Sequence, residues 1–354
     1  MGGAGTGSGP SLRPVRSSPV SRAAPERVTV LGAGIVGLSS ALALVTRARR
    51  PPAVTVVADR FLTETTSAGS GGFWMPYALN DTPAADIERW GSASFERFAE
   101  LHRSPDVDAA GVSLVEVRGV GDDPPPSWAG SVPNYRALSA RDLALMGLGE
   151  HSAGFAYTSF VADQERHLRW LTERCREHGV EFERRRVGSL AELSGVAGGG
   201  VVVNCSGLGA RDLFGDRDVV PIRGQTVRVD APWVTGVWQA DGGATYVIPQ
   251  RDSVVLGGTR QVGEALEASR DADVADVLER TSRLLPGLAR APVLRAWAGL
   301  RPGRSRVRVA AESVPVPGAP ALRVAHNYGH GGAGVTLAWG CAMDVLEMFE
   351  GMAQ

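Results

Sequence analysis

The pattern of apolar and polar positions near the start of the chain predicts a strand, a helix and a second strand in close succession. Residues 28–31 form a short apolar run that leads directly into Gly32-Ala-Gly-Ile-Val-Gly37. An apolar helix is predicted over 38–45, and a second buried strand over 54–58 ends at Asp59. This order is typical of the βαβ unit that binds a dinucleotide.

Each glycine of this turn has a physical role. The first allows the tight turn, the second lets the backbone approach a pyrophosphate, and the third lets the helix pack on the strand. Unpaired N–H groups at the start of the helix then face the phosphates. Asp59 is expected to accept hydrogen bonds from ribose hydroxyls. A plain glycine turn and a solvated acid are the alternatives, and the complete βαβ order favours nucleotide binding. The residues of this predicted site are Gly32, Gly34, Ile35, Val36, Gly37 and Asp59.

The rest of the chain mixes helical and strand-like patterns. Amphipathic spacing predicts helices over 81–102, 163–178 and 271–285, and strand-like runs fall at 201–204, 225–229, 245–248 and 253–257. We therefore predict an α/β fold in which a nucleotide domain (27–80, 151–215 and 316–350) is interrupted by a second domain (81–150 and 216–315), with the ligand between them. Residues 1–26, rich in Gly, Ser and Pro, are predicted to be a disordered tail.

The composition limits the classes of partner that the chain is expected to bind. The formal net charge is -1 and the pI is near 6.6, so nothing attracts the chain to nucleic acid or to an anionic membrane surface. No run approaches the roughly 20 apolar residues that span a bilayer. The three cysteines lie far apart without metal-binding spacing, which argues against a zinc site and a disulfide framework and favours a reducing compartment. A small molecule is the expected partner, and no metal is expected.

The chain contains no lysine, since every basic residue apart from histidine is arginine. This excludes a lysine Schiff base to pyridoxal phosphate and a Walker-type phosphate lysine. If the substrate is an amine, another cofactor must accept its electrons.

A second glycine-rich segment lies near the C-terminus, where Gly331, Gly332 and Gly334 precede an apolar helix. The start of that helix can stabilise the negative charge that develops at N1 and the C2 carbonyl of a reduced flavin. A nicotinamide ring, which gains positive charge on oxidation, has less use for such a helix.

The segment His326-Asn-Tyr-Gly-His-Gly-Gly-Ala-Gly334, with Gly340-Cys-Ala342, resembles the signature of the D-amino-acid oxidase and D-aspartate oxidase family. The resemblance covers nearly all of the chain after the tail. It implies a Rossmann-like FAD-binding domain interrupted by a substrate domain built on a mixed, largely antiparallel sheet. The other matching segments are Asp59-Arg60 with Thr65-Thr66, 73–77, 202–207, Gly224-Gln225, 246–249, 256–258 and Gly299-Leu-Arg-Pro302.

Carried over residue by residue, the resemblance adds several positions to the FAD site. Val187 follows a basic run, and the other positions lie in the two glycine-rich regions or between them. The added residues are Arg60, Thr65, Thr66, Gly72, Phe73, Val187, Gly331, Gly332, Gly334, Val335 and Thr336.

The resemblance also implies three catalytic residues. It places Arg301 opposite the substrate carboxylate, which a guanidinium can grip through two parallel charge-assisted bonds. Tyr246 would donate its hydroxyl to the same carboxylate, and the Gly332 carbonyl would hold the amine. The alternatives are a surface salt bridge for Arg301 and an ordinary strand tyrosine at 246. His326 and His330 are expected to be packed, hydrogen-bonded residues.

The implied reaction is direct hydride transfer from the α-carbon to flavin N5, with no protein acid or base. O2 then reoxidises the flavin to give peroxide, and the imino acid hydrolyses to a 2-oxo acid and ammonia. Vertebrate members carry a lid tyrosine where this chain has Gly242, so we expect an open entrance. Residues 352–354 lack a peroxisomal address, so we expect a cytoplasmic location, and a homodimer is left open.

Substrate choice is divided between two patterns. Arg260, in Thr-Arg-Gln, resembles the D-aspartate branch, whereas Tyr77, Gly332 and Asn327 resemble the branch for neutral substrates. We predict broad use of neutral D-amino acids. A D-aspartate oxidase and a glycine or secondary-amine oxidase stay open as alternatives, as do a nicotinamide dehydrogenase and a flavin-binding protein without turnover.

Overall fold

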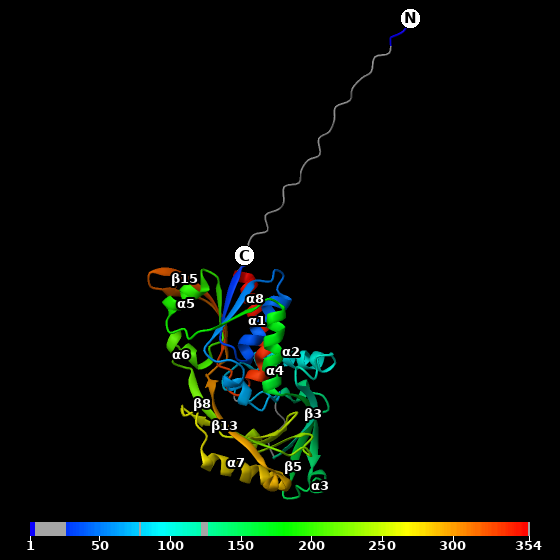
Figure 1. The fold of residues 1–354 in the computed structure, drawn as a ribbon. Coiled ribbons are helices and arrows are strands. Elements are labelled where there is room, and N and C mark those ends of the chain that lie inside the picture. Colours follow the sequence, from blue (N-terminus) through cyan, green and yellow to red (C-terminus); the bar gives the residue numbers. More distant parts are fainter. Residues whose placement is uncertain (4–25, 78, 122–126, 353–354) are drawn as a thin grey trace.

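The computed structural model describes residues 1–3, 26–77, 79–121 and 127–352, and it builds two parts on two large sheets (Figure 1). One sheet has six strands in the order β14-β15-β7-β1-β2-β6, and the other has nine. The predicted tail lies outside the described residues except for its first three positions and Glu26.

The six-stranded sheet is parallel apart from its edge strand β14, which runs antiparallel to β15. Its central strands are almost wholly buried, as expected when helices cover both faces of a parallel sheet. The strands are β1 (Arg27–Leu31), β2 (Ala53–Ala58), β6 (Glu181–Arg184), β7 (Val201–Asn204), β14 (Arg308–Val316) and β15 (Ala319–Tyr328).

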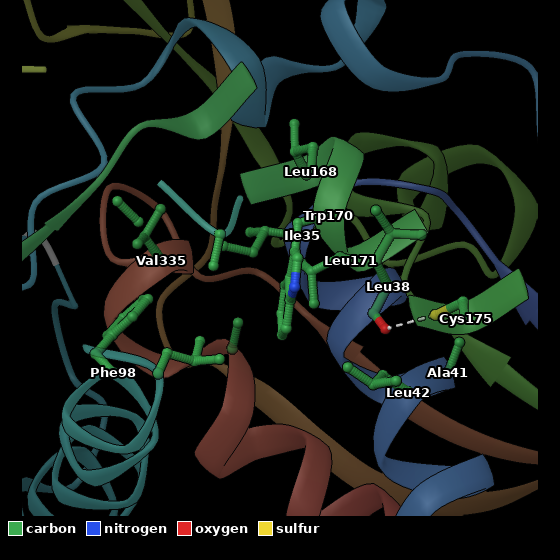
Figure 2. Close-up of a cluster of buried hydrophobic side chains, with 14 of the residues drawn as sticks. Ile35, Leu38, Ala41, Leu42, Phe98, Leu168, Trp170, Leu171, Cys175 and Val335 are labelled. Atoms are coloured by element: carbon green, nitrogen blue, oxygen red, sulfur yellow. Dashed lines mark hydrogen bonds between the residues drawn. The ribbon is translucent and has the colours of Figure 1, made fainter. Parts of the chain in front are cut away.

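Three helices pack together on one face of this sheet: α1 (Ile35–Arg47), α4 (Gln164–Glu177) and α8 (Gly334–Met352). The short helix α5 (Leu190–Ala197) packs its Leu193 into a separate apolar cluster with strands β7, β14 and β15. Figure 2 shows the core between α1 and α4, where the Cys175 thiol lies 3.7 Å from the Leu38 carbonyl oxygen. The labelled side chains of this cluster are Ile35, Leu38, Ala41, Leu42, Phe98, Leu168, Trp170, Leu171, Cys175 and Val335.

The nine-stranded sheet is antiparallel except where β3 pairs with β9. Helix α7 (Asp271–Leu284) packs Val277 and Leu284 against one face (Figure 1). The strands are β3 (Val112–Val120), β4 (Arg136–Ser139), β5 (Ala153–Ala162), β8 (Val220–Val229), β9 (Val237–Ala240), β10 (Thr245–Pro249), β11 (Val254–Gly257), β12 (Gln261–Val262) and β13 (Val293–Gly303). The remaining α-helices are α2 (Ala84–His102), α3 (Ala140–Leu145) and α6 (Ala210–Leu213).

The predicted α/β fold, with a Rossmann-like unit and a mixed, largely antiparallel second sheet, is confirmed. The predicted domain boundaries remain a proposal. Strand pairing groups β5 with the nine-stranded sheet and β14 with the six-stranded one, although the sequence prediction divided both regions differently. Within the described ranges no helix combines the length and apolar character that a membrane crossing requires.

The contact between α2 and α8 gives a test of the packing. A β-carbon at Gly340 would overlap the Trp90 carbonyl oxygen, whereas one at Gly351 meets nothing within 4 Å. We expect Gly340→Ala to lower the free energy of unfolding by about 1–3 kcal/mol, the usual cost of overpacking. Gly351→Ala, on the same helix, should leave stability unchanged or raise it, because alanine favours helix. Thermal unfolding of both variants measures this, and equal Tm values would contradict the packing described.

Candidate active site

A pocket lies on the face of the nine-stranded sheet that is crossed by residues 66–77. Its floor is a row of residues that stand directly opposite one another on five adjacent strands. Directly paired residues point to the same face of a sheet, so the row presents one continuous surface. In order across the sheet, from β9 to β13, the row is Gln239, Tyr246, Gly257, Thr226 and Trp297.

Arg301 lies on this floor beside the row. Its guanidinium rests on Gly224, where a β-carbon would overlap Nη1, Nη2 and Cζ. Nη1 donates a hydrogen bond of 2.9 Å to the Thr259 carbonyl oxygen. A guanidinium has five N–H donors, so this bond orients the head and leaves donors for an anionic ligand in the pocket.

Tyr246 lies next to Arg301 and depends on glycines in the same way. A β-carbon at Gly257 would overlap its ring, and one at Gly258 would lie 2.5 Å from its hydroxyl oxygen. Burial raises the pKa of Tyr246, and the nearby charge of Arg301 offsets only part of this effect. The hydroxyl therefore stays protonated at neutral pH and can donate a hydrogen bond to an anion.

The opposite wall of the pocket is formed by the start of α8 and the segment before it. Gly332 lies against Tyr77, and a β-carbon there would be 2.7 Å from Cδ1 of that ring. The Thr336 hydroxyl donates to the Met75 carbonyl oxygen (2.8 Å) and accepts from the Met75 N–H (3.1 Å). One pocket thus contains the three predicted catalytic residues, Tyr246, Arg301 and Gly332, together with Thr66, Gly72, Phe73 and Val335 from the predicted FAD site.

The glycine turn between β1 and α1 has the shape that the sequence predicted. Gly32 has φ +109°, and a β-carbon there would overlap the Cys205 carbonyl oxygen. A β-carbon at Gly37 would overlap the Gly32 carbonyl oxygen. Helix α1 then begins at Ile35; its N-cap residue, Gly34, has no side chain, and its first turn contains no acidic residue. Its backbone N–H groups, that of Val36 among them, are suited to an anionic group.

Other predicted FAD-site residues lie away from the pocket. Asp59 and Arg60 are exposed at the end of β2, and Arg60 forms an ion pair of 2.8 Å with Glu267 from the nine-stranded part. The Thr65 hydroxyl donates to the Leu62 carbonyl oxygen, and Val187 packs on the apolar cluster that contains Leu31. Gly331 and Gly334 flank Gly332 at the start of α8.

The segment 66–77 joins the glycine turn to the pocket. The Ile35 N–H donates to the Ser67 hydroxyl (3.0 Å), and the Thr66 hydroxyl donates to the Leu300 carbonyl oxygen (3.2 Å). The glycine turn, the free N–H groups in the first turn of α1, the acid at the end of β2 and the pocket at the start of α8 are the features that FAD binding needs. The residues present therefore fit this cofactor.

Several residues of the site were missed by the sequence reasoning, and three of them differ in whether a signal could have revealed them. Trp297 could have been found, because it alternates with Gly299 and Arg301 on one face of β13. Ser67 follows a predicted pair of threonines, but its contact with Ile35 depends on the tertiary fold. Gln239 carried no sequence signal, and it reaches the pocket only because β9 pairs with β10 opposite Tyr246.

Two residues considered for substrate choice lie elsewhere. Arg260 is exposed and Asn327 is fully buried, and neither lines the pocket within the described part of the chain. The Asn327 amide instead donates to the Ser40 hydroxyl (3.1 Å). Tyr77 does line the pocket.

Two histidines beside the glycine-rich segment are packed residues. His326 is hydrogen-bonded to Asn204 (3.1 Å) and Glu312 (2.9 Å). Burial lowers the pKa of both His326 and His330 to about 4, so both are uncharged at neutral pH. Among the residues that the structure covers, no group of three His, Cys, Asp or Glu side chains is arranged to hold a metal ion.

Comparison with known proteins identifies the family of the chain. Residues 27–348 match the family model described as FAD dependent oxidoreductase. The D-aspartate oxidase of Homo sapiens is 35% identical, with 91% of this chain and 94% of the relative covered. A D-amino-acid oxidase of Streptomyces coelicolor is 38% identical, with 91% and 96% covered.

Solved structures share the fold. The glycine oxidase of Geobacillus kaustophilus matches with a TM-score of 0.74 at 20% identity, covering 92% of this chain and 95% of that one. The glycine oxidase of Bacillus cereus gives 0.72 at 17% identity, with 93% and 96% covered. At these identities the likeness shows the architecture alone.

The glycine turn predicts a specific loss of cofactor binding. In Gly32→Ala, the positive φ and the overlap with Cys205 together cost on the order of 1–3 kcal/mol, so the Kd for FAD should rise about tenfold or more. Gly195→Ala is the control, because that helical glycine has no neighbour within 4 Å. Quenching of FAD fluorescence on titration with apoprotein gives both Kd values. Equal affinity of the two variants for FAD would rule out the turn as the phosphate site.

Proposed function

Because the chain belongs to the FAD-dependent oxidoreductase family whose members include D-amino-acid and D-aspartate oxidases, we propose that it oxidises D-amino acids. The products are a 2-oxo acid, ammonia and hydrogen peroxide. One observation carries the proposal: Arg301, Tyr246 and Gly332 share a pocket with the segment that leads from the glycine turn.

The three residues hold the substrate by complementary contacts. Arg301 grips the carboxylate through two parallel charge-assisted bonds, and Tyr246 donates its hydroxyl to the same group. The Gly332 carbonyl accepts a hydrogen bond from the amine. With carboxylate and amine fixed, the configuration of the α-carbon decides which way its hydrogen points. Alignment of this kind can lower a barrier by about 7–11 kcal/mol.

When bound, FAD supplies the hydride acceptor and the route by which electrons reach O2. The protein's own contribution is positioning, and the pocket supports this division of roles. Its described lining contains no aspartate, glutamate or histidine, and the raised pKa of Tyr246 keeps that hydroxyl protonated, so it is not available as a base. A reaction that needs no protein base suits such a lining.

The residues around the pocket favour neutral substrates. Phe73, Met75, Gln239 and Ile248 contribute to the lining, and Gln239 is tied to the Met75 sulfur (3.1 Å). Arg301 is the one cation in the described lining, and its role is taken by the α-carboxylate. A second carboxylate, on the substrate side chain, would be buried without a partner, which is costly.

The entrance supports broad use of side chains. The turn at Asp241–Gly243 is a single short 3-10 element, and Gly243 lines the pocket where a bulky lid residue would narrow it. We therefore infer that large neutral side chains are accepted. D-aspartate oxidation is the second candidate, favoured by the relative in Homo sapiens, and a glycine or secondary-amine oxidase is the third.

We also propose a cytoplasmic location. The three cysteines are free thiols, two of them buried, as expected in a reducing compartment. The small net negative charge supports a small-molecule partner rather than nucleic acid or a membrane surface. A homodimer remains compatible with the sequence.

A substrate panel tests the proposed function. Peroxide formation by the FAD-loaded protein should be fast with D-alanine and D-phenylalanine, and much slower with D-aspartate, glycine, sarcosine and L-alanine. Faster turnover of D-aspartate than of D-alanine would identify a D-aspartate oxidase instead. Preference for glycine or sarcosine would place the chain with the amine oxidases.

Replacement of Arg301 tests how the carboxylate is held. Arg301→Ala should raise KM for D-alanine at least roughly 10- to 100-fold, because the loss of even one hydrogen bond to a charged group costs about 1.5–3 kcal/mol. Bound flavin should be retained. Arg295→Ala is the matched control, since Arg295 lies on the same strand, pairs with Glu165 and does not line the pocket. Unchanged KM in Arg301→Ala would refute the assignment.

A further inference from the structure

A second arginine, Arg280, lies behind the pocket floor. It projects from α7 and is held by Asp276 one turn earlier, whose carboxylate accepts from both Nε (3.0 Å) and Nη2 (2.8 Å). Its Nη1 donates to the Ala244 carbonyl oxygen (3.2 Å) and the Thr245 hydroxyl (2.6 Å). Its Nη2 donates to the Gly258 carbonyl oxygen (3.0 Å). One guanidinium therefore binds two strand ends that are separate in the sequence.

Those two strand ends carry the carboxylate site. Gly258 lies directly beneath the Tyr246 hydroxyl, as the close approach of its β-carbon position shows. The next residue, Thr259, offers the carbonyl oxygen that orients Arg301. Two consecutive carbonyl groups thus each accept from an arginine, one from Arg280 outside the pocket and the other from Arg301 inside it.

Arg280 also fixes the turn at the entrance. The Thr245 hydroxyl, which accepts from Arg280, donates to the Asp241 carboxylate (2.5 Å). The Gly258 N–H donates to the Ala244 carbonyl oxygen (2.9 Å), which closes the link between the turn and the floor. The turn that stands in place of a longer lid is therefore tied to the surface on which Tyr246 lies.

We propose that Arg280 is a positioning residue for the carboxylate site. It holds the Gly258–Thr259 segment so that the Tyr246 hydroxyl and the Arg301 guanidinium converge on the same anion. This role rests on the proposed function, because the anion in question is the carboxylate of the substrate. Arg280 itself lines neither the pocket nor the glycine turn within the described residues.

The experiment compares two arginines of one helix. Arg280→Met keeps an unbranched side-chain stem and removes the guanidinium with its donors. Arg283→Met is the matched control, because Arg283 also pairs with an acid four residues away, Glu279, and is mostly exposed. Arg280→Lys keeps the charge but cannot reproduce the fork that reaches both strand ends. Each protein is prepared loaded with FAD.

Four quantities separate positioning from general destabilisation. They are the Kd of benzoate, a carboxylate with no α-hydrogen to lose, measured from the change in the flavin spectrum; the Kd of FAD; and KM and kcat for D-alanine. We expect Arg280→Met to raise the benzoate Kd and the KM about tenfold, since small misplacements far from the reacting atoms have effects of this size or larger. The Kd of FAD and kcat should change less than threefold, Arg280→Lys should be intermediate, and Arg283→Met should match the wild type.

Several results would overturn the role. Benzoate affinity equal to the wild type in Arg280→Met would do so, and so would a parallel loss of FAD and benzoate binding. If Arg280→Met does not fold, Arg280→Lys decides, and unchanged benzoate affinity in that variant would reject the proposal. Failure of the wild type to bind benzoate or oxidise D-alanine would instead reject the proposed function, and this role with it.

Discussion

The flat contact of the Arg301 guanidinium with Gly224 is the constraint on which the site depends. A guanidinium can present several donors to a carboxylate only if the orientation of its plane is fixed. Here Gly224, on the neighbouring strand, has no side chain, so the guanidinium of Arg301 can lie against its backbone. The same device recurs beneath Tyr246, which covers Gly257 and Gly258, and beneath the Trp297 indole, which covers Gly69 and Gly299. Glycine weakens a strand. These glycines therefore lower the local stability of the sheet, and in return the large side chains above them can lie flat against its backbone.

The second requirement is that this surface be fixed relative to the cofactor turn. The segment 65–77 meets it through three contacts: Ser67 with the start of α1, Thr66 with β13, and Met75 with the start of α8. Each contact joins the segment to an element that also carries predicted FAD-site or catalytic residues. The ion pair between Arg60 and Glu267 adds a surface link between the two parts, although an exposed pair of this kind contributes little free energy. The pocket and the glycine turn are therefore linked by one continuous stretch of chain.

Local signals account for what the sequence predicted well. The βαβ unit depends on contacts within some thirty residues, so Gly32, Gly37 and the end of β2 were readable from spacing alone. The pocket depends on register between distant strands, and neither Gln239 nor Arg280 has a local pattern that reveals where it points. Arg301 and Tyr246 were proposed as site residues through a family resemblance, and the position of Trp297 beside Arg301 could have been predicted from alternation along β13. Asn327 and Arg260 also match family patterns, and among the described residues neither lines the pocket.

The central claim is that one guanidinium and one phenol hold the acid group of the ligand in front of the cofactor. A crystal structure of the FAD-loaded protein with benzoate tests it most directly. The account predicts both carboxylate oxygens about 2.7–2.9 Å from the Arg301 nitrogens, the distance of a charge-assisted pair, with one of them also bound by the Tyr246 hydroxyl. A carboxylate seated elsewhere, or an Arg301 side chain turned away from the flavin ring, would contradict it.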